Sequence, residues 1–214
     1  LLSDARKLNK VRHPLMIERF MALSVDADAK LVEPYPNPHL SVNASDLEEA
    51  LRSQGLSRDK PILVLCPAAE FGPAKRWPAA YFAELAKAKV AQGYQVWLFG
   101  SVKDQAITAS IQAASDNQCI DLAGKTSLAQ AIDLMSLAAC VVSNDSGLMH
   151  IAAALNRPLV ALYGSSSPNF TPPLSDRKTV LKLDLVCQPC FQRSCPLSHF
   201  RCMRDLNPGM VIEA

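Results

Sequence analysis

The chain has 214 residues, of which 49% are hydrophobic and 20% are charged, and its formal net charge is +2. This length allows one or two domains with a sizeable core. A net charge this small argues against nucleic acid as a partner. No apolar run is long enough to cross a bilayer, and the sequence shows no signal-peptide layout.

The N-terminal part differs in character from the rest. Residues 14–23 have the apolar spacing of a helix. Residues 32–38, VEPYPNP, contain three prolines and cannot form a regular helix, so they are expected to be a linker. Ser45, with Glu48 three residues later, predicts the capped start of a helix that Gly55 ends.

From residue 61 onward, predicted strands and helices alternate. Short apolar runs predict strands at 61–66, 94–99, 119–122, 140–143, 158–163 and 179–183. Helices are expected between them, at 78–92, 102–114, 127–138 and 148–155. This alternation predicts right-handed βαβ units and an α/β fold, a Rossmann-like parallel sheet with helices on both faces.

Ligands bind such sheets at the carboxyl ends of the strands. The loops expected there are 67–77, 100–104, 123–127 and 143–147, and we expect them to converge on one site. The sequence contains no G-x-G-x-x-G, which weakens an NAD-type interpretation.

The segment 140–164 is the most informative, because a polar turn joins a buried strand to a helix there. Asn144, Asp145, Ser146 and Gly147 supply turn residues and a helix N-cap together. The free N–H groups and the dipole of such a helix favour a phosphate or diphosphate. An ordinary strand-to-helix connection would explain the same spacing, so both interpretations stay open.

Two motifs add a family resemblance. NDSGLMHIAAALNRPLVALYG at 144–164 and PAAEFGPAKRWP at 67–78 resemble the ADP-heptose:lipopolysaccharide heptosyltransferases of glycosyltransferase family 9, most nearly the heptosyltransferase II group. These enzymes have the GT-B fold, in which two Rossmann-like halves face each other across a cleft. The resemblance implies that 46–214 form the C-terminal, donor-binding domain, that 32–45 are a linker and that 1–31 are a remnant of the N-terminal acceptor-side domain.

The activity implied is inverting transfer of L-glycero-D-manno-heptose from ADP-heptose to the inner core of lipopolysaccharide. The acceptor would be heptosyl-Kdo2-lipid A at the membrane surface, with the enzyme cytoplasmic and peripheral at the inner face of the inner membrane. No cofactor is implied. The general base would belong to the N-terminal half, outside this chain, so the chain alone is expected to be inactive.

The resemblance also assigns roles to residues of the first three loops. Lys75 would contact the donor diphosphate and stabilise the leaving ADP, although a solvated surface lysine is the alternative. Asp104 would bind ribose hydroxyls or simply start a helix. Lys125 and Thr126 would lie near the adenine or serve a generic helix start. Trp77 is expected to pack in the core.

Roles in the 144–164 motif follow in the same way. Asp145 would contact the sugar hydroxyls of the donor, with a helix cap as the alternative. Ser146 and Gly147 would present a hydroxyl and a backbone N–H to the diphosphate. His150 lies one helical turn from Ser146 and could reach the same phosphates, or be a structural histidine.

Seven cysteines remain. Cys66, Cys119 and Cys140 belong to apolar runs and are expected in the core. The other four form C-x2-C-x4-C-x6-C: Cys187, Cys190, Cys195 and Cys202. They could bind zinc or an iron–sulfur cluster, form disulfides or remain free, and since the family mechanism needs no metal, none is expected. His199 and Arg201 would lie at the donor-site rim or on the surface.

Three alternatives stay open on the sequence. The first is another GT-B nucleotide-sugar enzyme, such as an epimerase. The second is a metal-binding interaction module built on the cysteine-rich segment. The third is a stand-alone nucleotide-binding domain.

Overall fold

Six strands form one parallel sheet in the order β3-β2-β1-β4-β5-β6. The computed structural model describes residues 4–214. The strands are β1 (Ile62–Cys66), β2 (Gln95–Leu98), β3 (Cys119–Asp121), β4 (Cys140–Asn144), β5 (Leu159–Tyr163) and β6 (Lys178–Lys182). The order reverses between β1 and β4, which is where such sheets place their ligand crevice. The predicted Rossmann-like α/β fold is therefore confirmed.

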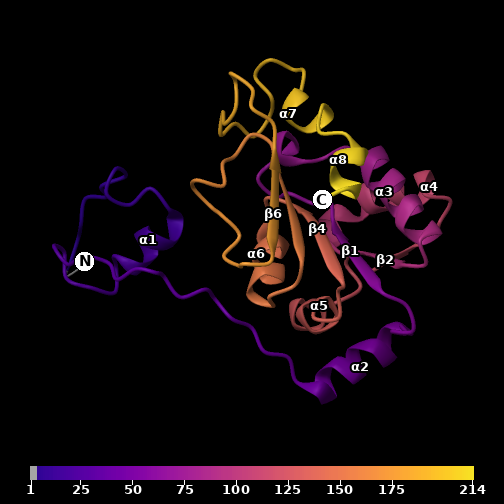
Figure 1. Cartoon of the computed structure of the whole chain (residues 1–214). Coiled ribbons are helices and arrows are strands. Elements are labelled where there is room, and N and C mark those ends of the chain that lie inside the picture. The colour runs from indigo at the N-terminus through magenta and orange to yellow at the C-terminus, as the bar shows by residue number, and fades with distance from the viewer. Residues whose placement is uncertain (1–3) are drawn as a thin grey trace.

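Helices cover both faces of the sheet (Figure 1). One face packs against α2 (Ala44–Gln54), α5 (Leu128–Met135) and α6 (Gly147–Ala154). The other face packs against α3 (Ala79–Ala91), α4 (Gln105–Ala114), α7 (Arg201–Arg204) and α8 (Pro208–Ile212). All five residues of β1 are buried because successive side chains enter the two cores in turn.

The start of α2 corrects one prediction. Asn43, not Ser45, caps this helix, and its Oδ1 accepts the backbone N–H of Ser45 at 2.9 Å. Asn43 has the extended backbone of a cap (φ −83°, ψ 133°), whereas Ser45 is already helical. The predicted end is confirmed, since Gly55 has a left-handed backbone with φ of 61°.

Other helix boundaries also differ from the prediction. The helix expected over 14–23 is shorter, α1 (Met16–Met21). The helix expected over 102–114 begins with a 3₁₀ turn, η2 (Val102–Asp104), before α4. A second turn, η1 (Pro73–Lys75), and the short helices α7 and α8 were not predicted.

The segment that carries α1 lies to the side of the sheet and is joined to α2 by extended chain (Figure 1). It contacts the main body at Phe170, whose carbonyl accepts the N–H of Met16 at 2.9 Å. The guanidinium of Arg19 lies 4.7 Å from the centroid of the Phe170 ring. The division at 31 and 45 stays a prediction, with the qualifications that α2 begins at Ala44 and that residues 1–3 lie outside the described residues.

Gly164 marks the tightest packing at the carboxyl end of β5. A Cβ at this position would lie 2.6 Å from the Sδ of Met203 and 2.8 Å from the carbonyl oxygen of Ala74. We therefore expect Gly164→Ala to lower the free energy of unfolding by about 1–3 kcal/mol, measured by urea denaturation. Gly147→Ala is the matched control, because nothing lies within 4 Å of its Cβ position. Equal unfolding midpoints for the two variants would contradict the packing assigned to Gly164.

Candidate functional site

A cavity of about 460 Å³ opens at the carboxyl end of the sheet. Each of the four loops predicted to converge contributes to its wall, so this prediction is confirmed. The cavity also reaches the first turns of α5 and α6. Its lining residues are Ala68, Glu70, Phe99, Gly100, Ser101, Asp104, Thr126, Ser127, Leu128, Ala131, Ser146, Gly147, Leu148 and Ile151.

The first turn of α6 carries no side-chain cap. Ser146 is its N-cap residue, with an extended backbone (φ −148°, ψ 173°), and its hydroxyl makes no capping bond. The hydroxyl instead lies 3.3 Å from the Oγ of Ser143. Backbone N–H groups of a first helical turn have no partner within the helix. At the cavity wall these donors are therefore available to an anion.

Lys75 and Asp145 form an ion pair beside this helix start. The Nζ of Lys75 lies 2.5 Å from the Oδ2 of Asp145, and the two side chains are only 16% and 4% exposed. Asp145 directly follows β4, and Lys75 closes η1 in the 67–77 loop. The solvated-surface alternative for Lys75 is therefore wrong. Sequence reasoning gave each residue its own donor contact and did not foresee that they pair with each other.

Asn144 is a positioning residue that sequence reasoning took only as part of a turn. Its side chain is buried at the end of β4. Its Oδ1 accepts the backbone N–H of Trp77 at 3.1 Å, and its Nδ2 donates to the carbonyl of Pro67 at 2.7 Å. Both ends of the Lys75 loop are thus tied to the strand that carries Asp145. The signal available in the sequence was an amide side chain directly after an apolar run.

Trp77 anchors the same loop from the other side. The indole is fully buried, and its Nε1 donates to the carbonyl of Leu206 at 2.6 Å. The ring meets Phe82 edge-on at a centroid distance of 4.8 Å. Its predicted packing role is confirmed.

Three further predicted residues lie in the two neighbouring loops. Asp104 and Thr126 line the cavity. The carboxylate of Asp104 already accepts the N–H and the hydroxyl of Ser101 at 2.8 and 2.7 Å, which is the helix-start role. Lys125 is exposed and outside the cavity lining, and its carbonyl accepts Gln54 Nε2 at 3.1 Å.

His150 lies on α6 but does not line the 460 Å³ cavity. It lines a separate cavity of about 310 Å³ between α1 and the 170–174 loop. Desolvation lowers the pKa of its imidazole, while the charge of Asp145 raises this pKa and that of Lys75 lowers it. His150 therefore does not share the cavity whose wall includes Ser146 and Gly147.

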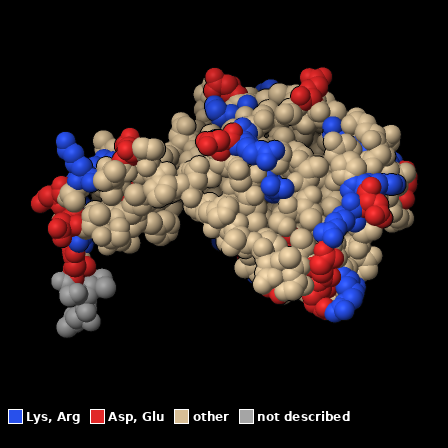
Figure 2. Space-filling view, turned by 60° about the horizontal axis from the view of Figure 1, so that its bottom comes forward, with Lys and Arg blue, Asp and Glu red and all other residues tan. Residues whose placement is uncertain are grey.

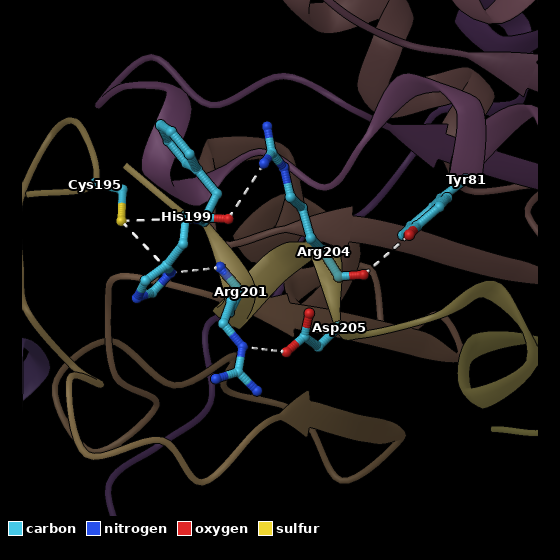
Figure 3. A network of polar contacts seen from close by, with 7 residues as sticks. Tyr81, Cys195, His199, Arg201, Arg204 and Asp205 are labelled. Carbon is cyan, nitrogen blue, oxygen red and sulfur yellow. Dashed lines mark hydrogen bonds and ion pairs between the residues drawn. The ribbon is translucent and has the colours of Figure 1, made fainter. Parts of the chain in front are cut away.

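The cysteine-rich segment forms a loop that is held in place by polar contacts (Figure 3). In the described part of the chain no cysteine forms a disulfide. No three His, Cys, Asp or Glu side chains of residues 4–214 are placed to hold a metal ion. Arg201 Nε donates to Asp205 at 2.7 Å, and neither His199 nor Arg201 lines the 460 Å³ cavity.

Residues 1–201 match the sequence family described as glycosyltransferase family 9 (heptosyltransferase). The chain belongs to this family. The family-9 assignment, read first from two motifs, is thereby confirmed.

Among the relatives of this family-9 chain are lipopolysaccharide heptosyltransferase 2 of Salmonella typhimurium and of Escherichia coli K12. Each is 44% identical to it, over 100% of this chain and 64% of the relative. The structure of E. coli ADP-heptose LPS heptosyltransferase II superposes with a TM-score of 0.88 at 43% identity, covering 99% of this chain and 64% of that one. The family-9 chain thus spans about two thirds of the length of these relatives.

Proposed function

We propose that the chain is the donor-binding part of an inverting heptosyltransferase. It would transfer L-glycero-D-manno-heptose from ADP-heptose to heptosyl-Kdo2-lipid A in the inner core of lipopolysaccharide. The names of its family-9 relatives support a transferase over an epimerase-like enzyme. The general base and the acceptor site are assigned to the N-terminal half of the enzyme.

One observation carries this proposal: the cavity reaches the uncapped start of α6, which directly follows Asp145. Asp145 and its partner Lys75 adjoin this helix start but lie outside the cavity lining. The apolar side chains of Phe99, Leu128 and Ile151 suit an adenine ring. The N–H groups that follow Ser146 suit a diphosphate, because they donate to anions and the helix dipole adds positive potential. ADP placed in this way would direct its sugar toward Asp145.

The ion pair gives Lys75 and Asp145 a partner in both states of the site. Without donor the two charges neutralise each other in a nearly buried position. With donor bound, Lys75 would turn to the diphosphate and Asp145 to the hydroxyls of the heptose. Neither charge is then left buried and alone, a situation that costs several kcal/mol.

In the reaction an acceptor hydroxyl attacks the anomeric carbon of the heptose. Its oxygen forms the new glycosidic bond, and its proton passes to the general base. The bond from the anomeric carbon to ADP breaks with its electron pair on the phosphate oxygen. Lys75 and the α6 N–H groups would stabilise this growing negative charge, which is greater in the transition state than in the bound donor.

The acceptor is a membrane lipid, so we place the enzyme at the inner face of the inner membrane as a peripheral protein. Among residues 4–214, no helix has both the length and the apolar character of a membrane span. On the face seen in Figure 2, basic and acidic side chains are interspersed and form no large patch of one sign.

Gly147→Ala tests the diphosphate position. The added methyl group meets nothing within 4 Å in the free protein, so stability is expected to change little. A diphosphate on the first turn of α6 would meet that methyl group, and we expect ADP affinity in calorimetry to fall at least about tenfold, roughly 1.4 kcal/mol. Gly209→Ala on α8 is the control, and its ADP affinity should match the parent. An unchanged affinity for Gly147→Ala would remove the diphosphate from this helix start.

A further inference from the structure

The cysteine loop, residues 187–202, covers another, much smaller cavity. Its volume is about 20 Å³, which is room for a single atom or one water molecule. All four cysteines of the C-x2-C-x4-C-x6-C pattern line it, at 187, 190, 195 and 202. Four thiols that are spread over sixteen residues of sequence therefore line the same small cavity in the fold.

Two buried polar atoms at the same cavity have no partner among the described residues. They are the hydroxyl of Ser165, which is 1% exposed, and the Oε1 of Gln188. The amide of Gln188 is otherwise held, since its Nε2 donates to the carbonyl of Tyr163 at 3.0 Å. A buried polar atom without a partner costs about 1–3 kcal/mol, so two at one cavity indicate a small polar or charged occupant, a water molecule or an ion.

The polar contacts around Cys195 indicate which side chains could bind a metal ion and which could not (Figure 3). The N–H of Phe200 donates to the Sγ of Cys195 at 3.4 Å, a contact that suits a thiolate. The Nδ1 of His199 accepts the N–H of Arg201 at 3.0 Å. A metal-bound imidazole would instead donate an N–H from its second nitrogen. His199 is therefore a supporting residue, and the ligand set is four sulfurs.

We propose that Cys187, Cys190, Cys195 and Cys202 bind one thiophilic metal ion, zinc in preference. A tetrahedral set of four thiolates with a C-x2-C pair is typical of structural zinc. No three side chains of residues 4–214 already stand at metal-binding positions, so binding must draw the loop inward around the cavity. Each thiol that becomes a ligand releases its proton to solvent. The hydroxyl of Ser165 then has a thiolate to which it can donate.

Such an ion would stabilise the segment that carries Lys75. Arg193, between the second and third cysteines, accepts the N–H of Ala74 at 3.0 Å through its carbonyl. Ser165 donates its N–H to Ala74 at 3.3 Å and accepts that of Phe191 at 2.7 Å. The cysteine loop and the Lys75 loop are thus bonded to each other directly. Metal binding itself does not depend on the proposed function, whereas an effect of the metal on ADP binding does.

The test is to measure the metal content of the purified chain by elemental mass spectrometry. We expect about one zinc ion per chain, removed by a strong chelator together with a clear fall in melting temperature. Cobalt added to the metal-free chain should give the thiolate charge-transfer and tetrahedral absorption bands of a four-sulfur site. This titration needs no variant and reports on the site without any activity.

Variants locate the ion. Cys190→Ser and Cys195→Ser should each lose most of the zinc, and Cys140→Ser, a partly buried thiol in β4 outside the cluster, should keep it. Lys75→Met should also keep it, which separates this site from the donor site. Less than about a tenth of an ion per chain after zinc reconstitution, with four reactive thiols, would overturn the proposal. A protein mass lower by two hydrogens for each disulfide would also overturn the proposal. Iron bound in place of zinc would overturn the preference for zinc.

Discussion

Replacing Lys75 by methionine is expected to weaken ADP binding about 10- to 100-fold in calorimetry, the 1.5–3 kcal/mol of a hydrogen bond to a charged group. The same change leaves the carboxylate of Asp145, only 4% exposed, without its partner. The free energy of unfolding should therefore fall by about 3 kcal/mol, measured by urea denaturation. A loop lysine on the surface would change neither quantity by this much.

Two further variants separate affinity from stability. Lys75→Met with Asp145→Asn should regain most of the lost stability, because no unpaired charge remains buried, but should not regain ADP affinity. Lys87→Met is the matched control, since Lys87 pairs with Asp116 at 2.8 Å at an exposed position outside the cavity lining. An exposed pair contributes about 0–1 kcal/mol, so both quantities should stay near the parent values. If Lys75→Met binds ADP like the parent, Lys75 does not hold the diphosphate.

Asp145→Asn is expected to separate ADP-heptose from ADP. Free ADP lacks the heptose hydroxyls, so its affinity should be preserved or increase, because the carboxylate no longer competes for Lys75. The extra affinity of ADP-heptose over ADP should largely disappear. Calorimetry with both ligands on the same preparation measures this difference.

Asp104→Asn provides the contrast, because a ribose contact is present in both ligands. If Asp104 binds the ribose, this variant should weaken ADP and ADP-heptose by the same factor and leave their ratio unchanged. Asp145→Asn should change the ratio alone. A parent-like preference for ADP-heptose in Asp145→Asn would refute the sugar contact and leave Asp145 as the partner of Lys75 only.

The four inner strands, β1, β2, β4 and β5, could be predicted from sequence because buried parallel strands are apolar along most of their length. β1 shows this most clearly, with every residue buried. The four loops could be placed at one edge of the sheet because parallel strands all have their carboxyl ends on the same side. The cap of α2 could not be resolved, because Asn43 and Ser45 are both good caps and only the backbone angles choose between them.

The chemistry of the site was only partly accessible from the sequence. Lys75 and Asp145 are brought together by the adjacency of β1 and β4, and nothing local in either motif encodes that they pair. Asn144 was missed as an anchor because its two partners lie in a distant loop. The short helices α7 and α8 follow from packing of Cys202, Met203 and Val211 into the core rather than from helix propensity.

The strand order also has a consequence for synthesis. β1 lies at the centre of the sheet, between β2 and β4, but β4 follows it by about 80 residues. At roughly 5–20 residues per second, one apolar edge of β1 stays unpaired for roughly 4 to 16 s while β2 and β3 are already available. During that interval the nascent chain exposes the unpaired backbone N–H and C=O groups of this strand edge, which β4 pairs with in the folded sheet. The strand that ends in the residues assigned to the donor is therefore also the one that closes the centre of the sheet.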